Sequence, residues 1–524
     1  MRAVRVPRPP AADLIHPGAG HLPVRRPARR AGDTVIAGLT RSGPATRRVP
    51  EWSEEPQAQA GTPRPLFEAR PPLRKLVVLA DADLLDVPGD GGMTRAALLA
   101  GLLTHPYIKL LRYRDDRQAA AGQLPGEEPL RGWARLLPPD GQEWRGLVYA
   151  YDSGGETYTG VSAKVAAYAR DDTSCSAYRD RPPDAAADQR ERDALAADAA
   201  TAVEADLFIT ERPYLLGTRS IRTPCVTLCQ VPEALAMVSL YLRSQGEFFL
   251  WRGADGRGGL TANEWLYYQI GAVALLPERW RWSRGKAAAL QPGAPDPVGD
   301  LNSALLLRVV RALRTRDSFH RTFNLPQQRD AVRTLLVELD TILVMLMGAV
   351  DASARFIHVL LELQGDQRAA GWQKSGWRSG LTGQSRPLAD LFADGTPLAD
   401  VLTILCRLRN TVHGQAIEAT MRQRGLARDA PIILPAEHER QILACMDNVG
   451  GRAAWGVQPG ADGAVAVDPG RFVEQLFPAV LRLLNTVMTV TPAAYVRGQE
   501  LRPDSGPHWY SEQNRLSVSW QLGF

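Results

Sequence analysis

The sequence predicts an α+β protein with several domains, in which an α/β domain precedes a helical bundle. The chain has 524 residues, which is more than a single hydrophobic core usually serves. Strand-like and helix-like segments alternate between residues 73 and 244, an order typical of a mainly parallel sheet. From residue 326 onward, apolar residues recur every three or four positions in successive segments, which predicts packed helices.

These patterns divide the chain into segments of different composition. The first segment is rich in Arg and Pro and has no periodicity, so we expect it to be disordered. Near the C-terminus, Leu516, Val518, Trp520 and Leu522 alternate with polar residues, which is typical of a strand. The predicted organisation is a basic extension (1–70), an α/β domain (71–245), a helical connector (246–325), an all-α bundle (326–500) and a C-terminal tail or strand (501–524).

Positive charge is concentrated in the N-terminal extension. Residues 1–50 hold ten Arg and two acidic residues, which gives a local charge of +8. The net charge of the whole chain is +5, so the remaining residues together carry a charge of −3. The extension is either a basic arm that binds nucleic acid or a solvated segment. The basic composition therefore says little about partners of the folded part of the chain.

Cysteine usage and hydropathy bear on the compartment. The five Cys residues are scattered and odd in number, which indicates reduced thiols and a cytoplasmic protein. Cys225 and Cys229 lack partners at a spacing suited to zinc. The most apolar run, residues 334–350, contains Glu338 and Asp340, so it predicts a core helix rather than a membrane span. We expect no membrane association.

Acidic residues follow the strand-like segments of the α/β domain. An apolar strand ends near Asp81 and Asp83, and Glu211 comes after a later strand. Asp193 opens the helix-like segment between them. Because the carboxyl ends of parallel strands line one crevice, Asp81 and Glu211 are placed to act together. The alternative is that these Asp residues form turns or begin the helices that follow the strands.

This order resembles PIN-like nuclease domains, in which a first strand ends in Asp, and a late helix opened by Asp precedes a strand ending in Thr. The matching segments are VLADADLL and DALAADAATAVEADLFIT. The resemblance implies a Mg²⁺ or Mn²⁺ site that activates water against a phosphodiester, with Asp81, Asp83, Asp193 and Glu211 as its ligands. Arg212 stands where the family usually has a further Asp or Asn, and no middle Glu is assigned.

The segment TPLADVLTILCRLRNTVHGQ predicts one helix with a polar end. Thr396 is a suitable N-cap, and Pro397 suits the first helical position. Arg409 and His413 are four positions apart and therefore share one helical face, with Asn410 beside Arg409. A cation, an amide and an imidazole at one helix end can bind a phosphate and transfer a proton. The same residues can instead bond the last helical carbonyls and cap the helix.

The end of this helix, LRNTVHG, resembles the signature of HEPN domains, helical bundles that include many metal-independent ribonucleases of prokaryotic defence and toxin systems. In that signature an Arg is usually followed by a polar residue, and four to six residues separate the Arg from a His. Arg409, Asn410 and His413 have this order, but only three residues separate Arg409 from His413. Five residues separate Arg407 from His413, which fits the spacing of the signature, but the residue that directly follows Arg407 is not polar. The resemblance implies that His413 is a general acid or base, that Arg409 holds the scissile phosphate, and that Arg407 adds a cationic contact.

The leading prediction is a ribonuclease of a prokaryotic toxin or antiviral defence system, with RNA as substrate and no cofactor at the bundle site. The expected partners are a second copy of the chain, paired through the bundle, and a neighbouring regulatory protein. The first alternative is a non-catalytic dimerisation bundle combined with an α/β domain that senses a nucleotide or a partner. The second alternative is a metal-dependent PIN-like nuclease.

Overall fold

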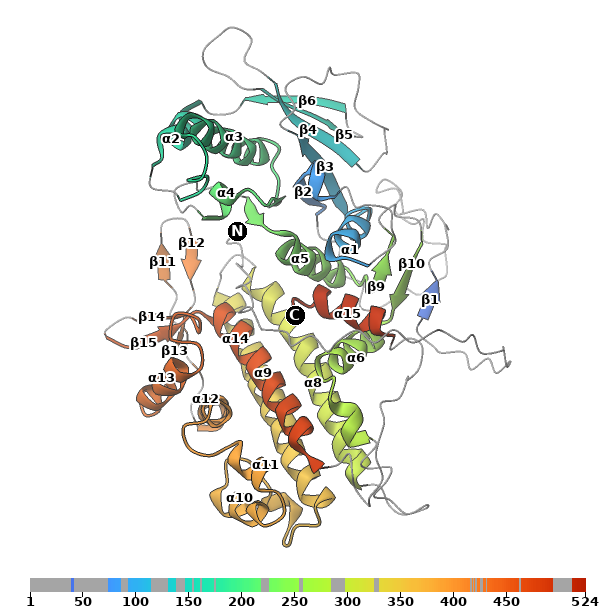
Figure 1. The fold of residues 1–524 in the computed structure, drawn as a ribbon, viewed down its shortest axis with the longest axis vertical. Coiled ribbons are helices and arrows are strands. Elements are labelled where there is room, and N and C mark those ends of the chain that lie inside the picture. The colour runs from blue at the N-terminus through green and yellow to red at the C-terminus, as the bar shows by residue number, and fades with distance from the viewer. Residues whose placement is uncertain are drawn as a thin grey trace, which may run out of the picture.

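The computed structural model describes residues 39–41, 74–85, 93–114, 131–137, 147–152, 155–160, 163–173, 176–217, 226–253, 258–283, 297–324, 329–414, 417, 419, 422–424, 427–429, 431–460, 463–492 and 511–524. The described strands of the N-terminal half form a mixed sheet with the order β6-β5-β4-β3-β2-β7-β8 (Figure 1). Its five parallel strands confirm the expected mainly parallel sheet, while β5 and β6 add an antiparallel edge beside β4. The parallel strands are β2 (Leu76–Asp81), β3 (Ile108–Arg114), β4 (Arg131–Leu137), β7 (Leu207–Ile209) and β8 (Thr227–Cys229), and the antiparallel ones are β5 (Leu147–Asp152) and β6 (Gly155–Gly160).

Helices cover both faces of this sheet (Figure 1). Val78 and Ala80 of β2 pack with α1 and α5, whereas Leu79 between them packs with α2, α3 and α4 on the other face. Burial on both faces explains why β2 is a continuous apolar run in the sequence. The helices are α1 (Arg95–Leu102), α2 (Ala163–Asp171), α3 (Pro183–Ala202), α4 (Pro213–Gly217) and α5 (Val231–Ser244).

The strand order reverses between β2 and β7. From β2 the chain adds β3 and β4 on one side, and later it adds β7 and β8 on the other side. The carboxyl ends of β2 and β7 therefore flank a topological switch point, which is where open α/β sheets form their ligand crevices. Asp81 ends β2 and Thr210 follows β7 directly, so both residues lie at this edge.

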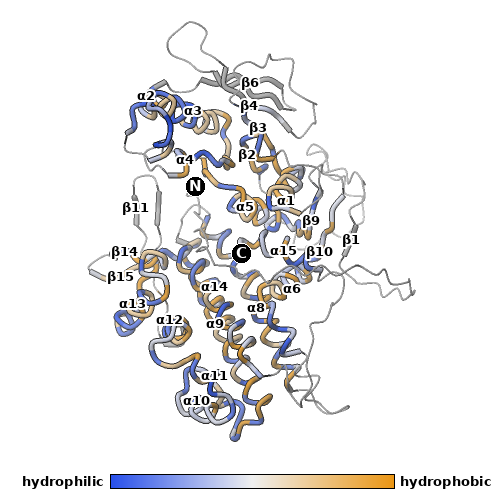
Figure 2. The backbone as a smooth tube through the Cα atoms, in the orientation of Figure 1, coloured by the Kyte–Doolittle hydropathy of each residue, from blue (hydrophilic) through white to orange (hydrophobic). Residues whose placement is uncertain are grey.

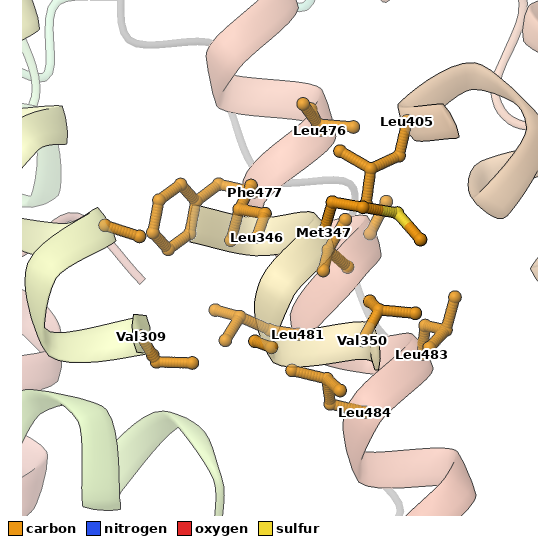
Figure 3. Close-up of a cluster of buried hydrophobic side chains, with 14 of the residues drawn as sticks. Val309, Leu346, Met347, Val350, Leu405, Leu476, Phe477, Leu481, Leu483 and Leu484 are labelled. Carbon is orange, nitrogen blue, oxygen red and sulfur yellow. The ribbon is translucent and has the colours of Figure 1, made fainter. Parts of the chain in front are cut away.

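The C-terminal half is mostly helical, and its buried apolar side chains form one continuous cluster. Figure 3 shows part of this cluster, where Val309 of α8, Met347 of α9, Leu405 of α12 and Phe477 of α14 converge. Hydrophobic and hydrophilic residues alternate in short steps along α8, α9 and α14, as expected for helices with one buried face (Figure 2). The principal helices are α6 (Glu264–Leu275), α8 (Pro297–Phe323), α9 (Arg329–Leu360), α12 (Pro397–Gly414) and α14 (Pro469–Val490).

The segment predicted as a connector contributes to the same core. Trp282, which follows α6, is buried and stacks on Phe356 of α9 with 4.0 Å between ring centroids. Leu305 of α8 is also fully buried in this cluster. The helices of residues 246–325 therefore pack as part of the bundle. None of the helices in the described ranges is long and apolar enough to cross a membrane.

The expectation of an all-α bundle is wrong, because short strands lie between α12 and α14. Ile432 and Val467 are buried in these strands, which are too short to leave a periodic pattern in the sequence. The strands form a ribbon of β11 (Arg422–Arg424) with β12 (Ala427–Asp429), and a sheet of β13 (Ile432–Ile433), β15 (Val465–Val467) and β14 (Val457–Pro459) beside α13 (Glu439–Asn448).

Part of the N-terminal extension is also paired. Strand β1 (Leu39–Arg41) lies antiparallel to β10 (Gly259–Ala262), which pairs in turn with β9 (Phe249–Arg252). The expectation of disorder is therefore wrong for these three residues. The rest of the predicted extension, residues 1–70, lies outside the described residues.

The C-terminal segment is a helix and not the expected strand. Helix α15 (Glu512–Gln521) begins after Ser511, whose side chain caps its first turn. Its buried face includes Ser517 and Gln521, which donate hydrogen bonds to backbone carbonyls of β9. The apolar alternation misleads because Leu516 is 43% exposed, while polar residues occupy part of the buried helical face.

A buried ion pair joins the two halves. Arg243 of α5 contacts Asp317 of α8, and their side chains are 4% and 9% exposed. Arg243 also donates to the hydroxyl of Tyr267 at 3.2 Å and to the carbonyl of Gln521 at 3.1 Å, while Tyr268 donates to Asp317 at 2.7 Å. Burial acts to raise the pKa of the Asp317 carboxyl, but the charges of Arg243 and Arg316 and the hydrogen bonds from Arg243 and Tyr268 together outweigh it, so the pKa is lowered. Helix α15 packs against both α5 and α6 at this junction (Figure 1).

Buried His105 predicts an acid-sensitive step in the stability of the α/β half. It packs edge-to-face on Tyr107 and Phe249, and burial, with the charge of Arg252, lowers its pKa to about 4. The unfolded chain binds this proton with a pKa of about 6.5, so stability falls as the pH drops from about 6.5 toward 4, by at most about 3 kcal/mol. His105→Asn, which keeps an acceptor but does not titrate, should reduce this loss in urea unfolding compared at pH 7 and pH 4.5.

His438→Asn is the matched control for this experiment. The side chain of His438 is 21% exposed and lies in the helical half, so its replacement leaves the buried surroundings of His105 unchanged. The control should therefore lose stability with acid as the wild type does. An undiminished loss in His105→Asn would show that another group causes the acid sensitivity.

Candidate functional site

Helix α12 carries the Arg and His of the HEPN-like signature. As predicted, Thr396 accepts a hydrogen bond from a backbone N–H of the first turn at 3.3 Å, and Pro397 is the first helical residue. The helix continues without a break to Gly414. Arg409 and His413 therefore lie on the same helical face, about one turn apart. The side chain of His413 is outside the described residues.

The two Arg side chains near this end have different partners. Arg407 donates from Nε to Oε1 of Gln441 in α13 at 2.9 Å. Nη1 of Arg409 donates to Oδ1 of Asn410 at 3.2 Å, while its buried Nε has no hydrogen-bond partner among the described residues. Arg409 therefore keeps donor capacity that the described protein does not use, whereas Arg407 is held against α13.

Charged residues of α9 lie near Arg409. The two helices are in contact, since Sγ of Cys406 lies 3.6 Å from Sδ of Met347. Burial raises the pKa of Asp351 on α9, and the charges of Arg355 and Arg409 act in the opposite direction. Nε of Arg355 is buried and likewise lacks a hydrogen-bond partner in the described part of the chain. Two guanidinium groups and one carboxyl thus share this region, which favours an anionic ligand.

A second polar cluster occupies the topological switch point. Arg212 contacts Asp81 through Nη2 at 2.9 Å and Asp193 through Nη1 at 3.1 Å. Thr210 donates to Oδ2 of Asp81 at 2.6 Å, and the backbone N–H of Arg212 donates to the Thr210 hydroxyl at 3.2 Å. Tyr178 donates a hydrogen bond to Asp193. We call these five residues, Asp81, Tyr178, Asp193, Thr210 and Arg212, the Arg212 cluster.

Asp193 is the most buried acid of the Arg212 cluster, with a side-chain exposure of 0%. It lies in the middle of α3, so the expectation that it opens a helix is wrong. Oδ2 accepts from Tyr178 at 2.7 Å and Oδ1 from Gln189 at 3.0 Å. Burial raises the pKa of Asp193, although these hydrogen bonds and the charge of Arg212 oppose the shift. Tyr178 has a φ of 63°, in the left-handed region that few residues other than glycine adopt.

The acids assigned by the PIN-like resemblance are only partly brought together. Asp81 and Asp193 share one guanidinium, whereas Asp83 is exposed, and exposed Glu211 accepts a hydrogen bond from Gln230 at 2.7 Å. Within the described ranges, no group of three or more His, Cys, Asp or Glu side chains is placed to hold a metal ion. This arrangement does not fit Mg²⁺ or Mn²⁺, because a positive charge already lies between the two buried carboxylates.

Sequence reasoning missed Tyr178 and Asp351. Tyr178 lies in a turn before α3 and belongs to no motif, so no signal in the sequence marks it. Asp351 and Arg355 are four positions apart on an unbroken α9, and this spacing is the signal that places them on one face. Arg212 was recognisable only as a departure from the PIN-like pattern.

Comparisons of the chain with protein-family models, with curated proteins and with solved structures found no match. Function is therefore inferred from two places in the fold. One is the end of α12, and the other is the Arg212 cluster at the switch point.

Proposed function

We propose that the chain is a metal-independent ribonuclease of a prokaryotic toxin or antiviral defence system, with its active centre at the end of α12. The observation that carries this proposal is the unbroken helix, which places Arg409 and His413 on one face. Arg409 is only partly buried, and among the described residues its guanidinium donates to Asn410 through Nη1. A guanidinium at an accessible helix end suits a phosphate, whose oxygens match its planar N–H groups. The HEPN-like signature supports the same assignment.

Each residue has a defined role in the proposed reaction. His413 acts as general base and acid, first taking the proton of an RNA 2′-hydroxyl. The 2′-oxygen attacks the adjacent phosphorus and the bond to the 5′-oxygen breaks, so the products carry a 2′,3′-cyclic phosphate and a 5′-hydroxyl. Arg409 stabilises the charge on the phosphate oxygens, and Asn410 orients the phosphate. Because Arg407 donates to α13, we expect it to contribute less.

The proposed assembly is a homodimer through the helical half, in which the ends of both α12 helices line one cleft. Pairing brings a second Arg409 and a second His413 to the RNA, and the added positive charge favours a polyanion. A neighbouring regulatory protein would restrain cleavage by covering this cleft.

The proposal is tested by comparing the RNA cleavage rates of two Arg variants on the same helix, α12. Arg409→Ala should lower the rate of RNA cleavage in excess EDTA by about 10²–10³-fold, because charge stabilisation at the phosphate is lost. Arg407→Ala is the matched control and should lose less than about 10-fold, since its side chain is directed to Gln441. Cleavage is measured on end-labelled RNA, and the melting midpoint of each variant is recorded. Equal losses in the two variants would contradict the assignment to Arg409.

A second candidate is a non-catalytic dimerisation bundle with a nucleotide- or partner-sensing α/β domain. Helix α5 begins at the edge of the switch point, where Gln230 and Glu233 form a capping box, and near its end Arg243 pairs with Asp317 of α8. It therefore links the edge where a ligand would bind to the helical half. Intact dimers without RNA cleavage would favour this candidate. Cleavage that EDTA abolishes and Asp81→Asn removes would favour a metal-dependent PIN-like nuclease.

A further inference from the structure

We propose that Arg212 is the resident cation of the α/β half, in the place where a divalent metal ion would otherwise balance Asp81 and Asp193. The site is the Arg212 cluster at the switch point, on the opposite half of the molecule from α12. The inference therefore stands whether or not the chain cleaves RNA.

The guanidinium of Arg212 lies between the two carboxylates. Its Nε is 3.2 Å and 3.1 Å from the two oxygens of Asp81, its Nη2 is 2.9 Å from Oδ1 of Asp81, and its Nη1 is 3.1 Å from Oδ1 of Asp193. One planar cation thus bridges both acids with charge-assisted hydrogen bonds. Its Cζ also lies 5.6 Å from the centre of the Tyr113 ring, whose face supports a positive charge.

The carboxylate oxygens that a metal ion would need already accept hydrogen bonds from the protein. The donors are Arg212 and Thr210 to the two oxygens of Asp81, and Arg212, Gln189 and Tyr178 to the two oxygens of Asp193. A divalent ion binds carboxylate oxygens through the same lone pairs. It could therefore enter only after several of these donors had moved away.

Because the carboxylates of Asp81 and Asp193 are largely buried, their negative charges must be balanced by a nearby positive charge. The side chains of Asp81, Asp193 and Arg212 are 15%, 0% and 14% exposed. Two carboxylates in such surroundings repel each other unless a positive charge lies between them, and a second cation would be repelled by the guanidinium. Arg212 supplies this charge as part of the chain. Its removal should leave two facing carboxylates and an adjacent space, which is an arrangement that binds a divalent cation.

This inference is tested by adding MnCl2 as the only metal salt. In the wild-type protein, MnCl2 should leave the melting midpoint unchanged and give no site-bound Mn²⁺ signal in electron paramagnetic resonance. Arg212→Ala should melt about 6–15 °C lower without metal, because a buried ion pair is broken. MnCl2 should then restore part of this loss, since a ligand of the folded state stabilises it. Adding Asp193→Asn should abolish the manganese response by removing one carboxylate.

Two matched variants separate the role of Arg212 from general effects. Arg192→Ala removes an exposed Arg beside Asp193 on α3, and it should melt and respond to MnCl2 as the wild type does. Arg212→Lys keeps the positive charge and should need no metal. A stable Arg212→Ala protein that ignores MnCl2 would overturn the inference. So would Mn²⁺ bound to the wild type and lost in Asp81→Asn, a result that requires no Arg212 variant to fold.

Discussion

Alanine in place of His413 should slow RNA cleavage by about 10²–10⁴-fold, because the proposed general acid and base is lost. Residue 413 is in the last turn of α12, beyond Leu408, the last residue of the helix that the structure shows buried in the apolar core. The substitution should therefore leave the packing of α12 intact. Cleavage is measured on labelled RNA at neutral pH in excess EDTA, with each protein at the same concentration so that dimer formation is equal.

His438→Ala is the control for this prediction, since it removes a partly exposed imidazole at the start of α13. It should cleave at the wild-type rate. Undiminished cleavage by His413→Ala would place the chemistry elsewhere in the molecule. A loss that is accompanied by a lower melting midpoint would instead indicate damage to the bundle.

The second large effect is expected at the junction of the two halves. Arg243→Met leaves Asp317 buried without its ion-pair partner, whose charge and hydrogen bonds are the main effects that lower the pKa of the carboxyl against burial. Removing one partner of a buried ion pair costs about 3–5 kcal/mol of unfolding free energy, because the remaining charge has no compensation. Urea unfolding at neutral pH, followed by tryptophan fluorescence, measures this loss.

Arg314→Met is the matched control, because Arg314 is on the same helix as Asp317 but pairs with Glu264 at the surface. The side chains of that surface pair are 66% and 42% exposed. Breaking it should change the unfolding free energy by less than about 1 kcal/mol. Arg243→Met combined with Asp317→Leu should recover much of the loss, since no unpaired charge stays buried. If Arg243→Met were as mild as Arg314→Met, the buried pair would not hold the junction together.

The elements that could be predicted from the sequence are those with a strong local sequence pattern. The continuous apolar run of β2 and the alternation of strands with helices indicated a parallel sheet, and the structure confirms it. Helix α12 was recognised from its cap at Thr396, from Pro397 and from its apolar stripe. Caps and helical periods depend on residues a few positions apart, so a single sequence contains them completely.

The parts that were missed depend on distant partners. Helix α15 buries Ser517 and Gln521, and only the carbonyls of β9 make those polar residues suitable for the interior. The order of strands around β2 and β7 is likewise set by packing between remote segments. In the candidate sites, the positions of Asp81 and Arg409 followed from local patterns. The bridging of Asp81 and Asp193 by Arg212 did not, because three separate elements create it.

The contacts between α15 and β9 also bear on how the chain folds. Ser517 and Gln521 bond to Leu250 and Phe249 across sequence separations of 267 and 272 residues. Closing loops of this length costs chain entropy before any contact compensates, and such distant pairings slow folding. We expect the hairpin of neighbouring helices α8 and α9 to form early and α15 to dock late. Until α15 docks, the two halves would lack the contacts that this helix makes with α5, α6 and β9.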